Sequence, residues 1–419
     1  RAGAGRQRAV TAAPAPPVEE YRARARSWLS EQLPEKRGWR GDGWGTGSDA
    51  VPVFNVYDDA SGRALMSAGA AWQQKKYAAG YGAISLPADL GGQGLDFEYE
   101  RAYLETEAEF DTPTWDELLE VTIDLVGPTV AVHGTPEQRE LWLKPMLAAE
   151  LLCCQLFSEP GAGSDLASLT CSAVRHGDGW LVNGQKVWNS GAQFADLGML
   201  IARTDPSAKH AGLTAFIVPM DLPGIEVRPI RQMTGGESFN EVYFTDVLVP
   251  DAARLGAEGE GWTVTLTTLR FEREHSAMNG GSGLGELLDK LVALVEHEGR
   301  QDDPLVQVAL GRLYERVRMV QLIAVRVQEA MESGEAPGPE GSLGKLLWSQ
   351  VLTEVSEFVV DLLGPRIVAD SGQWGSFAWA QHVLGAPGFR IAGGSDEIQR
   401  TIIAERVLGL PREPRVAKP

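Results

Sequence analysis

The chain has 419 residues, of which 43% are hydrophobic and 23% charged, a composition typical of a globular protein built from two or three substructures. Its formal net charge of −19 argues against DNA or RNA as the main partner, because binding to phosphate backbones needs a basic surface. No apolar run approaches the roughly 20 residues of a membrane span, so we expect no membrane partner.

The chain ends and the cysteines bear on the cellular compartment. Residues 1–17 lack the apolar middle of a secretory signal, so we interpret them as a flexible tail, and residues 413–419 also as a tail. The cysteines are Cys153, Cys154 and Cys171. This small, odd number argues against a disulfide framework and favours a reducing, cytoplasmic location. No CxxC or HxxxH pairing occurs, so no metal site is predicted.

Residues 18–150 predict an N-terminal α-helical domain. The stretches VEEYRARARSWLSEQL and ALMSAGAAWQQKKYAAGY have the amphipathic period of helices. Thr135, Pro136 and Gln138 indicate a helix start, with Thr as the N-cap, Pro at the first helical position and Gln completing a capping box.

Residues 151–255 change period and predict a middle β domain. Short, β-rich stretches such as WLVNGQKVW and LTAFIVPM are separated by Gly, Pro, Asp or Asn. The stretch RHGDGW predicts a hairpin with Asp178 and Gly179 at its tip. We therefore expect a small antiparallel barrel or sandwich.

Residues 256–412 return to the helical period and predict a C-terminal four-helix bundle. The stretch that begins GWTVTLTTLRFEREHS predicts a long helix with a weak point at Gly280 and Gly281. Near the end, Ser395 is the expected N-cap of a short amphipathic helix that follows a glycine loop. The predicted fold class is mainly α with a central β domain.

Two motifs of the middle domain offer ligand-binding groups. In FSEPGAGSD, Gly161 and Gly163 let the backbone approach a ligand closely, and Ser158 and Ser164 add polar groups. In QKVWNSGA, Trp188 offers a flat aromatic face beside hydrogen-bonding groups. The alternatives are a surface loop that joins two strands and a tryptophan of the core, and the residues alone leave both open.

Five stretches in the same order resemble the acyl-CoA dehydrogenase family. They are EPGAGSD at 159–165, NGQKVWNSGA at 183–192, ARTDP at 202–206, FNEVYFTDVLVP at 239–250 and GGSDEIQRTIIAERVLGLP at 393–411. The resemblance covers about residues 20–412 and implies that family's layout of a helical domain, a small β domain and a helix bundle.

This resemblance also implies chemistry. Family members use FAD and remove a proton and a hydride from adjacent carbons of an acyl thioester, which leaves a trans 2,3-double bond. They commonly pass the electrons to an electron-transfer flavoprotein. The flavin carries the hydride chemistry, while the protein supplies binding, orientation and electrostatics. The substrate implied is an acyl-CoA, with an acyl-carrier thioester left open.

Four residues match family positions at the flavin ring. Phe157 and Ser158 would contact the ring through backbone and hydroxyl groups. Trp188 and Ser190 would pack and hydrogen-bond on its other side.

Other matching positions lie further along the ligands. Ser164 matches a residue that meets the CoA moiety, while Ser395 and Glu397 match positions at the phosphate and adenosine end of FAD. Arg300 stands in a stretch, HEGRQDDPLV, that is comparable to the family segment reaching the neighbouring subunit's FAD but lacks its Phe-Gly.

The position of the catalytic base departs from the common family pattern. Many members carry a Glu in the slot that Gly393 occupies here, and a glycine cannot abstract a proton. Other members carry the base on a long helix of the C-terminal domain, where this chain has Glu272 and Arg273. We expect Glu272 to be the base, Arg273 to orient it, and the Gly393 N–H to bind the thioester oxygen. The alternative is that Glu272 belongs to a solvated run of charges.

The resemblance leaves open both the oligomeric state and the reaction that the protein catalyses. The altered Arg300 segment makes cross-subunit contacts uncertain, so a homo- or hetero-tetramer or dimer is expected. Two alternatives keep the fold: a flavin oxidase or monooxygenase, and a non-catalytic partner subunit of a mixed tetramer. The vacancy at Gly393 favours a broad or branched acyl group.

Overall fold

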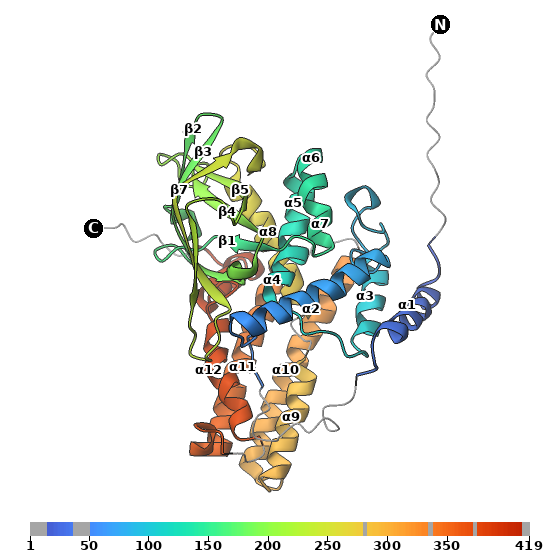
Figure 1. Ribbon diagram of the computed structural model, residues 1–419. Helices are drawn as coiled ribbons and strands as arrows, with labels where there is room; N and C mark the ends of the chain where they lie inside the picture. Colours follow the sequence, from blue (N-terminus) through green and yellow to red (C-terminus); the bar gives the residue numbers. More distant parts are fainter. Residues whose placement is uncertain (1–14, 37–50, 280–282, 334–337, 372–374, 413–419) are drawn as a thin grey trace, which may run out of the picture.

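A computed structural model describes five stretches of the chain (Figure 1). They are residues 15–36, 51–279, 283–333, 338–371 and 375–412. The β sheet lies at one end of the molecule, and the long helices α9 to α12 extend to the opposite end. This arrangement confirms the predicted order of helices, sheet and helices, while the domain boundaries stay a prediction.

The N-terminal part is helical, as expected. Its elements are α1 (Val18–Gln32), α2 (Asp59–Ala78), α3 (Phe97–Glu107), α4 (Glu117–Glu120), a π-helix (Val121–Val126), α5 (Gly127–His133), α6 (Pro136–Gln138), a second π-helix (Arg139–Leu143) and α7 (Lys144–Leu147). The predicted capping box is present, because the Gln138 N–H donates to Thr135 Oγ1 (3.2 Å) and the Thr135 N–H donates to Gln138 Oε1 (3.0 Å). The π-helices were not predicted.

The middle part contains one mixed sheet. Its strands are β1 (Cys153–Leu156), β2 (Ser172–His176), β3 (Gly179–Ser190), β4 (Leu197–Arg203), β5 (Leu213–Pro219), β6 (Ile225–Ile230), β7 (Phe239–Pro250) and β8 (Arg254–Leu255). Seven follow the order β6-β7-β3-β2-β4-β5-β8, and β1 pairs with β4. The expectation of purely antiparallel pairing is wrong, because β4 pairs in parallel with β1 and with the start of β2.

The hairpin between β2 and β3 differs slightly from the prediction. Its turn residues are Gly177, at φ 56°, and Asp178, whereas Gly179 already begins β3. A second irregularity lies further along β3, where a bulge opposite β7 separates Val187 from Asn189. Trp188 sits in that bulge.

The C-terminal part is a helical bundle. Its elements are α8 (Gly261–Asn279), α9 (Leu284–His297), α10 (Pro304–Glu332), α11 (Gly341–Leu363), α12 (Ala380–Phe389), α13 (Asp396–Ile402) and a π-helix (Ile403–Val407). The predicted weak point at Gly280 and Gly281 lies outside the described residues. Helix α8 packs against β4, β5, α5 and the first π-helix, and also against α10 and α11. It therefore connects all three parts of the molecule.

The three cysteines are free thiols in the interior. Cys153, Cys154 and Cys171 are at most 1% exposed. Burial raises all three thiol pKa values, that of Cys154 to about 12 and that of Cys171 to about 11. They behave as small apolar core residues.

Two other kinds of feature, a membrane-spanning helix and a metal-binding cluster, are absent from the described residues. None of the helices in those stretches is both long and apolar enough to cross a membrane. Within the same stretches, no three His, Cys, Asp or Glu side chains are grouped so that they could hold a metal ion.

Candidate active site

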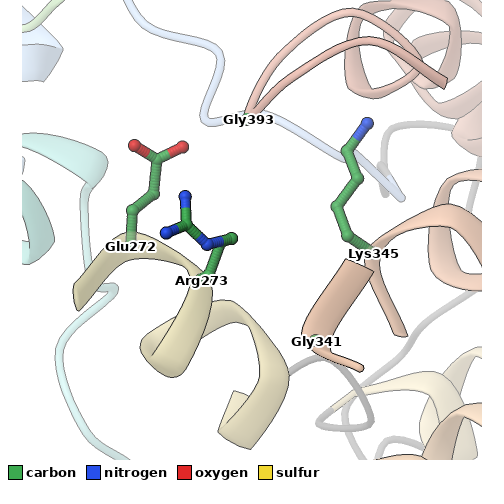
Figure 2. Close-up of a pocket in the computed structure, with 5 residues that line it drawn as sticks. All are labelled: Glu272, Arg273, Gly341, Lys345 and Gly393. Atoms are coloured by element: carbon green, nitrogen blue, oxygen red, sulfur yellow. The ribbon is translucent and has the colours of Figure 1, made fainter. Parts of the chain in front are cut away.

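A small pocket brings the predicted catalytic residues together. It is lined by Glu272 and Arg273 from α8, Gly341 and Lys345 from α11, and Gly393 from the loop before α13. Figure 2 shows the Glu272 carboxylate and the Lys345 side chain both directed toward the Gly393 loop. The structure thus joins Glu272 and Arg273 with Gly393, which lies far from them in the sequence, and adds Lys345, which sequence reasoning missed.

The Gly393 backbone has a conformation that favours glycine. Its φ is 62°, in the left-handed region, and Gly394 follows at φ 86°. A Cβ at position 393 would come within 3.4 Å of Glu272 Oε1 and 3.9 Å of Lys345 Cε. The Glu272 carboxylate therefore lies directly beside the position from which a side chain at 393 would project.

Side chains from two helices hold this glycine loop. Lys345 Nζ donates a hydrogen bond to the Gly394 carbonyl (2.8 Å), and Gln399 Nε2 donates to the Gly393 carbonyl (2.8 Å). Ser395 accepts from the Ile398 N–H at 3.4 Å, which confirms it as the N-cap of α13. The Gly393 N–H has no hydrogen-bond partner among the residues that the structure describes.

The two acidic residues after Ser395 have different surroundings. Asp396 is 1% exposed and accepts hydrogen bonds from Ser349 Oγ (3.0 Å) and Arg390 Nε (2.9 Å). The Glu397 side chain is 76% exposed in the first turn of α13, 3.8 Å from Arg400. Asp396 therefore fixes the loop, while Glu397 faces solvent, where its assignment to the adenosine end of FAD stays a prediction.

The surroundings of Glu272 oppose its ionisation. Burial raises the pKa of its carboxyl, and the negative charge of Glu120 raises it further. The positive charges of Arg273 and Lys345 and a hydrogen bond from Gln155 act in the opposite direction, but the net shift is upward. A carboxylate with a raised pKa holds a proton more strongly, which makes it a better base.

The loop of the EPGAGSD motif is tied to β3. Lys186 Nζ donates to the Phe157 carbonyl (3.0 Å), and the Val187 N–H donates to the Ser158 carbonyl (2.9 Å). The Ser158 hydroxyl has no partner among the described residues and stays available for a ligand. Ser164 is exposed further along the same loop.

A buried ion pair that sequence reasoning missed anchors this loop. Glu159, 7% exposed, binds Lys186 Nζ (2.9 Å) and accepts from the backbone N–H groups of Thr170 (2.7 Å) and Cys171 (2.8 Å). Burial alone would raise the pKa of Glu159, but the charge of Lys186 and these donors hold it below its usual range. Glu159 lies in the FSEPGAGSD motif and Lys186 in the QKVWNSGA motif. The presence of one charged residue in each of these β-rich stretches was the signal that could have predicted the pair.

Trp188 fits a stacking surface for a flat ligand. It is 61% exposed at φ 65°, a strained conformation for a bulky residue, and packs edge-on against Phe239 at 6.3 Å between ring centroids. Next to it, Asn189 Oδ1 is buried without a hydrogen-bond partner within the described stretches. Ser190 pairs with Phe239 at the end of β3. An exposed aromatic face beside this unpaired oxygen suits an isoalloxazine ring.

Arg300 lies in the loop between α9 and α10, away from this pocket. Its guanidinium binds Asp303 in the same loop, through Nε at 3.2 Å. The pocket at Glu272 does not include it. Its assignment to a neighbouring subunit's cofactor stays a prediction.

Comparison with known proteins identifies the family. Three consecutive descriptions match: "Acyl-CoA dehydrogenase, N-terminal domain" over residues 50–150, "middle domain" over 154–247 and "C-terminal domain" over 259–408. The fold and these matches define an FAD-dependent oxidoreductase. The chain belongs to the acyl-CoA dehydrogenase family.

Named relatives agree with this assignment. The acyl-CoA dehydrogenase IpdE1 of Mycobacterium tuberculosis is 38% identical over 399 residues, which cover 94% of this chain and 98% of that protein. Among solved structures, the Tcur3481-Tcur3483 steroid ACAD has a TM-score of 0.75 and 27% identity, over 94% of this chain and 98% of that one. The ChsE4-ChsE5 complex of Mycobacterium tuberculosis has a TM-score of 0.73 and 28% identity, over 96% and 99%.

Proposed function

We propose that this chain catalyses α,β-dehydrogenation of an acyl-CoA to the trans-2-enoyl-CoA with Glu272 as the base. The observation that carries the proposal is the position of the Glu272 carboxylate, 3.4 Å from where a Cβ at Gly393 would stand. The proposed base therefore lies on α8, beside position 393, at which many family members carry their catalytic Glu. Its raised pKa matches the task of taking a proton from carbon.

The chain's own residues perform the proton transfer and hold the thioester. The Cα–H bond of the substrate breaks as its proton moves to a Glu272 carboxyl oxygen, and the electron pair forms the double bond to Cβ. The free Gly393 N–H is suited to hydrogen-bond the thioester oxygen, where negative charge develops. Arg273, next to Glu272 in the pocket, orients the carboxylate.

Phe157, Ser158, Trp188 and Ser190 would hold the isoalloxazine ring of FAD. Bound FAD supplies the acceptor for the hydride that leaves Cβ. The exposed face of Trp188 and the unpartnered Ser158 hydroxyl support this assignment. Ser395 and Glu397 at the start of α13 are assigned to the phosphate and adenosine end, and Ser164 to the CoA moiety.

The substrate we propose carries a bulky, ring-containing acyl group. Two observations support it: glycine at 393 leaves space beside the base, and a structural relative 27% identical is described as a steroid ACAD. The two structural relatives are also named as two-component proteins, which supports an oligomer containing a second type of subunit. An electron-transfer flavoprotein is the proposed electron acceptor, and slow reoxidation of the reduced enzyme in air would distinguish this reaction from that of an oxidase.

The test is anaerobic bleaching of the flavin by a panel of acyl-CoAs. Glu272→Gln should give a yellow, folded protein whose flavin is bleached at least ~100-fold more slowly than in the wild type. Glu274→Gln is the matched control, because Glu274 lies on the same helix but pairs with Arg270 at 3.6 Å. Bleaching of Glu272→Gln at the rate of this control would show that the base lies elsewhere.

A further inference from the structure

Two side chains hold the glycine loop beside Glu272 by its carbonyl groups. Lys345 Nζ donates a hydrogen bond to the Gly394 carbonyl (2.8 Å). Gln399 Nε2 donates to the carbonyls of Gly393 (2.8 Å) and Gly394 (3.3 Å). Because Lys345 lies on α11 and Gln399 on α13, the loop is held from two helices. We name Lys345 and Gln399 the carbonyl clamp.

The clamp packs directly against the bare backbone of the two glycines. Gly393 and Gly394 have no side chains that could anchor them, and both have a positive φ. A Cβ at position 394 would come within 2.8 Å of Gln399 Nε2, and one at position 393 would come within 3.9 Å of Lys345 Cε. The orientation of the peptide groups in the loop therefore depends on the side chains of the clamp.

Gly393 lies between two anchored points of the backbone. On its N-terminal side the Ala392 N–H donates to the Gly388 carbonyl (2.9 Å), and on its C-terminal side its own carbonyl accepts from Gln399. The Gly393 N–H has no hydrogen-bond partner among the described residues, and Gly393 lines the pocket that contains Glu272. A donor that is fixed before the reaction stabilises developing charge without any cost of reorganisation.

The ammonium group of Lys345 is itself held close to the loop. Its side chain is 10% exposed, and Nζ lies 3.9 Å from Asp396 Oδ1. The Asp396 carboxylate also accepts from Ser349 Oγ (3.0 Å), which follows Lys345 by one turn of α11, and from Arg390 Nε (2.9 Å). Helix α11 thus fixes the loop at two points, through Lys345 at Gly394 and through Ser349 at Asp396. Figure 2 shows the Lys345 side chain directed toward the loop from this helix.

We propose that Lys345 and Gln399 are positioning residues of the reaction, which act through the glycine loop to direct the Gly393 N–H at the thioester oxygen. The inference rests on the proposed function and assigns two further residues to it. As the Cα proton leaves, negative charge grows on the thioester oxygen, and a donor already directed at that oxygen stabilises the charge. A loop that could turn would still bind the thioester but would stabilise this charge less. The clamp should therefore affect kcat more than KM.

The experiment measures the stretching frequency of a bound thioester carbonyl. A hydrogen bond to the carbonyl oxygen polarises the C=O bond and lowers this frequency. The probe is trans-3-cyclohexylprop-2-enoyl-CoA, isotopically labelled at its thioester carbonyl carbon and added to the FAD-loaded Glu272→Gln variant. Isotope-edited infrared difference spectra identify its carbonyl band, which should lie below the frequency of the same compound in buffer. A band at the frequency found in buffer would overturn the proposal.

Variants of the clamp then assign the shift of the carbonyl band. Adding Lys345→Met or Gln399→Leu to Glu272→Gln should remove about half of the shift or more, whereas Lys345→Arg, which keeps a cationic donor, should retain most of it. Since this background lacks the Glu272 carboxyl, the effect cannot come from a changed pKa of the base. Lys290→Met is the control, because Lys290 is also largely buried but binds Glu286 (2.9 Å) on α9, which contributes no residue to the pocket. An undiminished shift in both clamp variants would overturn the proposal.

Turnover of 3-cyclohexylpropanoyl-CoA by enzyme that retains Glu272 gives a second readout. Lys345→Met and Gln399→Leu should lower kcat about tenfold or more and change KM little. A merely structural clamp would lower the melting temperature of these variants and leave the carbonyl band unchanged, which would contradict the proposal.

The outcomes separate this inference from the proposed base. If Glu272→Gln still bleaches its flavin at the normal rate, the base lies elsewhere, yet the carbonyl band still tests the clamp. If Glu272→Gln is inactive but its carbonyl shift does not depend on Lys345 or Gln399, only the inference about the clamp fails.

Discussion

Glu159 and Glu272 show how one residue type acquires opposite properties in two regions of this molecule. Glu159, under the loop proposed to face the flavin, has a cation and two backbone N–H donors within 3 Å and a lowered pKa. Glu272, in the pocket at Gly393, has nearby cations but also Glu120, and its pKa is raised. The first carboxylate is satisfied and rigid, and the second is left partly uncompensated, as a base requires.

The largest expected effect comes from removing the cation of the satisfied pair. Lys186→Met would leave Glu159 buried without its counter-charge, so the free energy of unfolding should fall by about 3–5 kcal/mol. Urea unfolding of the FAD-loaded protein measures it. Lys209→Met is the control, because Lys209 pairs with Asp165 at 3.0 Å on the surface and should change stability little. Equal losses in the two variants would contradict the assigned importance of the buried pair.

A substitution at Gly393 should have the next largest effect. Gly393→Ala forces a left-handed backbone on alanine, which costs about 1–3 kcal/mol, and sets a methyl group against the Glu272 carboxylate. Gly235→Ala is the matched control, because Gly235 has φ 91° but open space around a Cβ. Both variants should lose thermal stability, and only Gly393→Ala should slow flavin bleaching. Equal bleaching rates in Gly393→Ala and Gly235→Ala would show that Gly393 takes no part in the reaction.

A substitution at Lys345 should have a smaller effect than one at Gly393, because it changes only the pKa of Glu272 and one hydrogen bond to the loop. Lys345→Met removes a charge that lowers the pKa of Glu272, together with the hydrogen bond to the Gly394 carbonyl. The pH at which bleaching reaches half its maximal rate should therefore move upward. Lys345→Arg keeps the positive charge and should retain most of the wild-type profile. An unchanged pH profile of bleaching in Lys345→Met would show that Lys345 only holds the glycine loop and does not lower the pKa of Glu272.

The smallest expected effect is a difference in how stability depends on pH. Because the folded-state pKa of Glu272 is raised, its burial destabilises the fold increasingly as pH rises above the ordinary value for a glutamate. Glu272→Gln should therefore gain melting temperature relative to wild type as the pH rises above the ordinary pKa of a glutamate. Glu159→Gln should lose relative stability over the rise from acid to neutral pH, because the pKa of Glu159 is lowered. Differences of the same sign would contradict the contrast between the two carboxylates.

The sequence predicted those features that local pattern determines. The helix–sheet–helix order, the capping box at Thr135 and the N-cap at Ser395 follow from residues close together in the chain. The family resemblance led to Glu272, Arg273 and Gly393, which the structure brings into one pocket, although their roles stay proposals.

The missed features depend on contacts between distant segments. The parallel pairing of β1 with β4 is decided by tertiary packing, not by the pattern of either strand. Lys345 stands in an apolar helix, and only the fold shows that its ammonium group meets the glycine loop 49 positions away. The pairing of His275 with Glu120 has the same origin, because a single polar residue on a helix carries no signal of its partner.

The interior position of the cysteines has a practical consequence for handling the protein. Thiolates are the reactive form, and Cys153, Cys154 and Cys171 are both buried and hard to deprotonate. A thiol reagent such as DTNB will therefore react only with molecules that have unfolded around these cysteines. Because these thiols do not react in the folded protein, a single cysteine introduced on the surface can be labelled with a fluorophore without removing the natural cysteines.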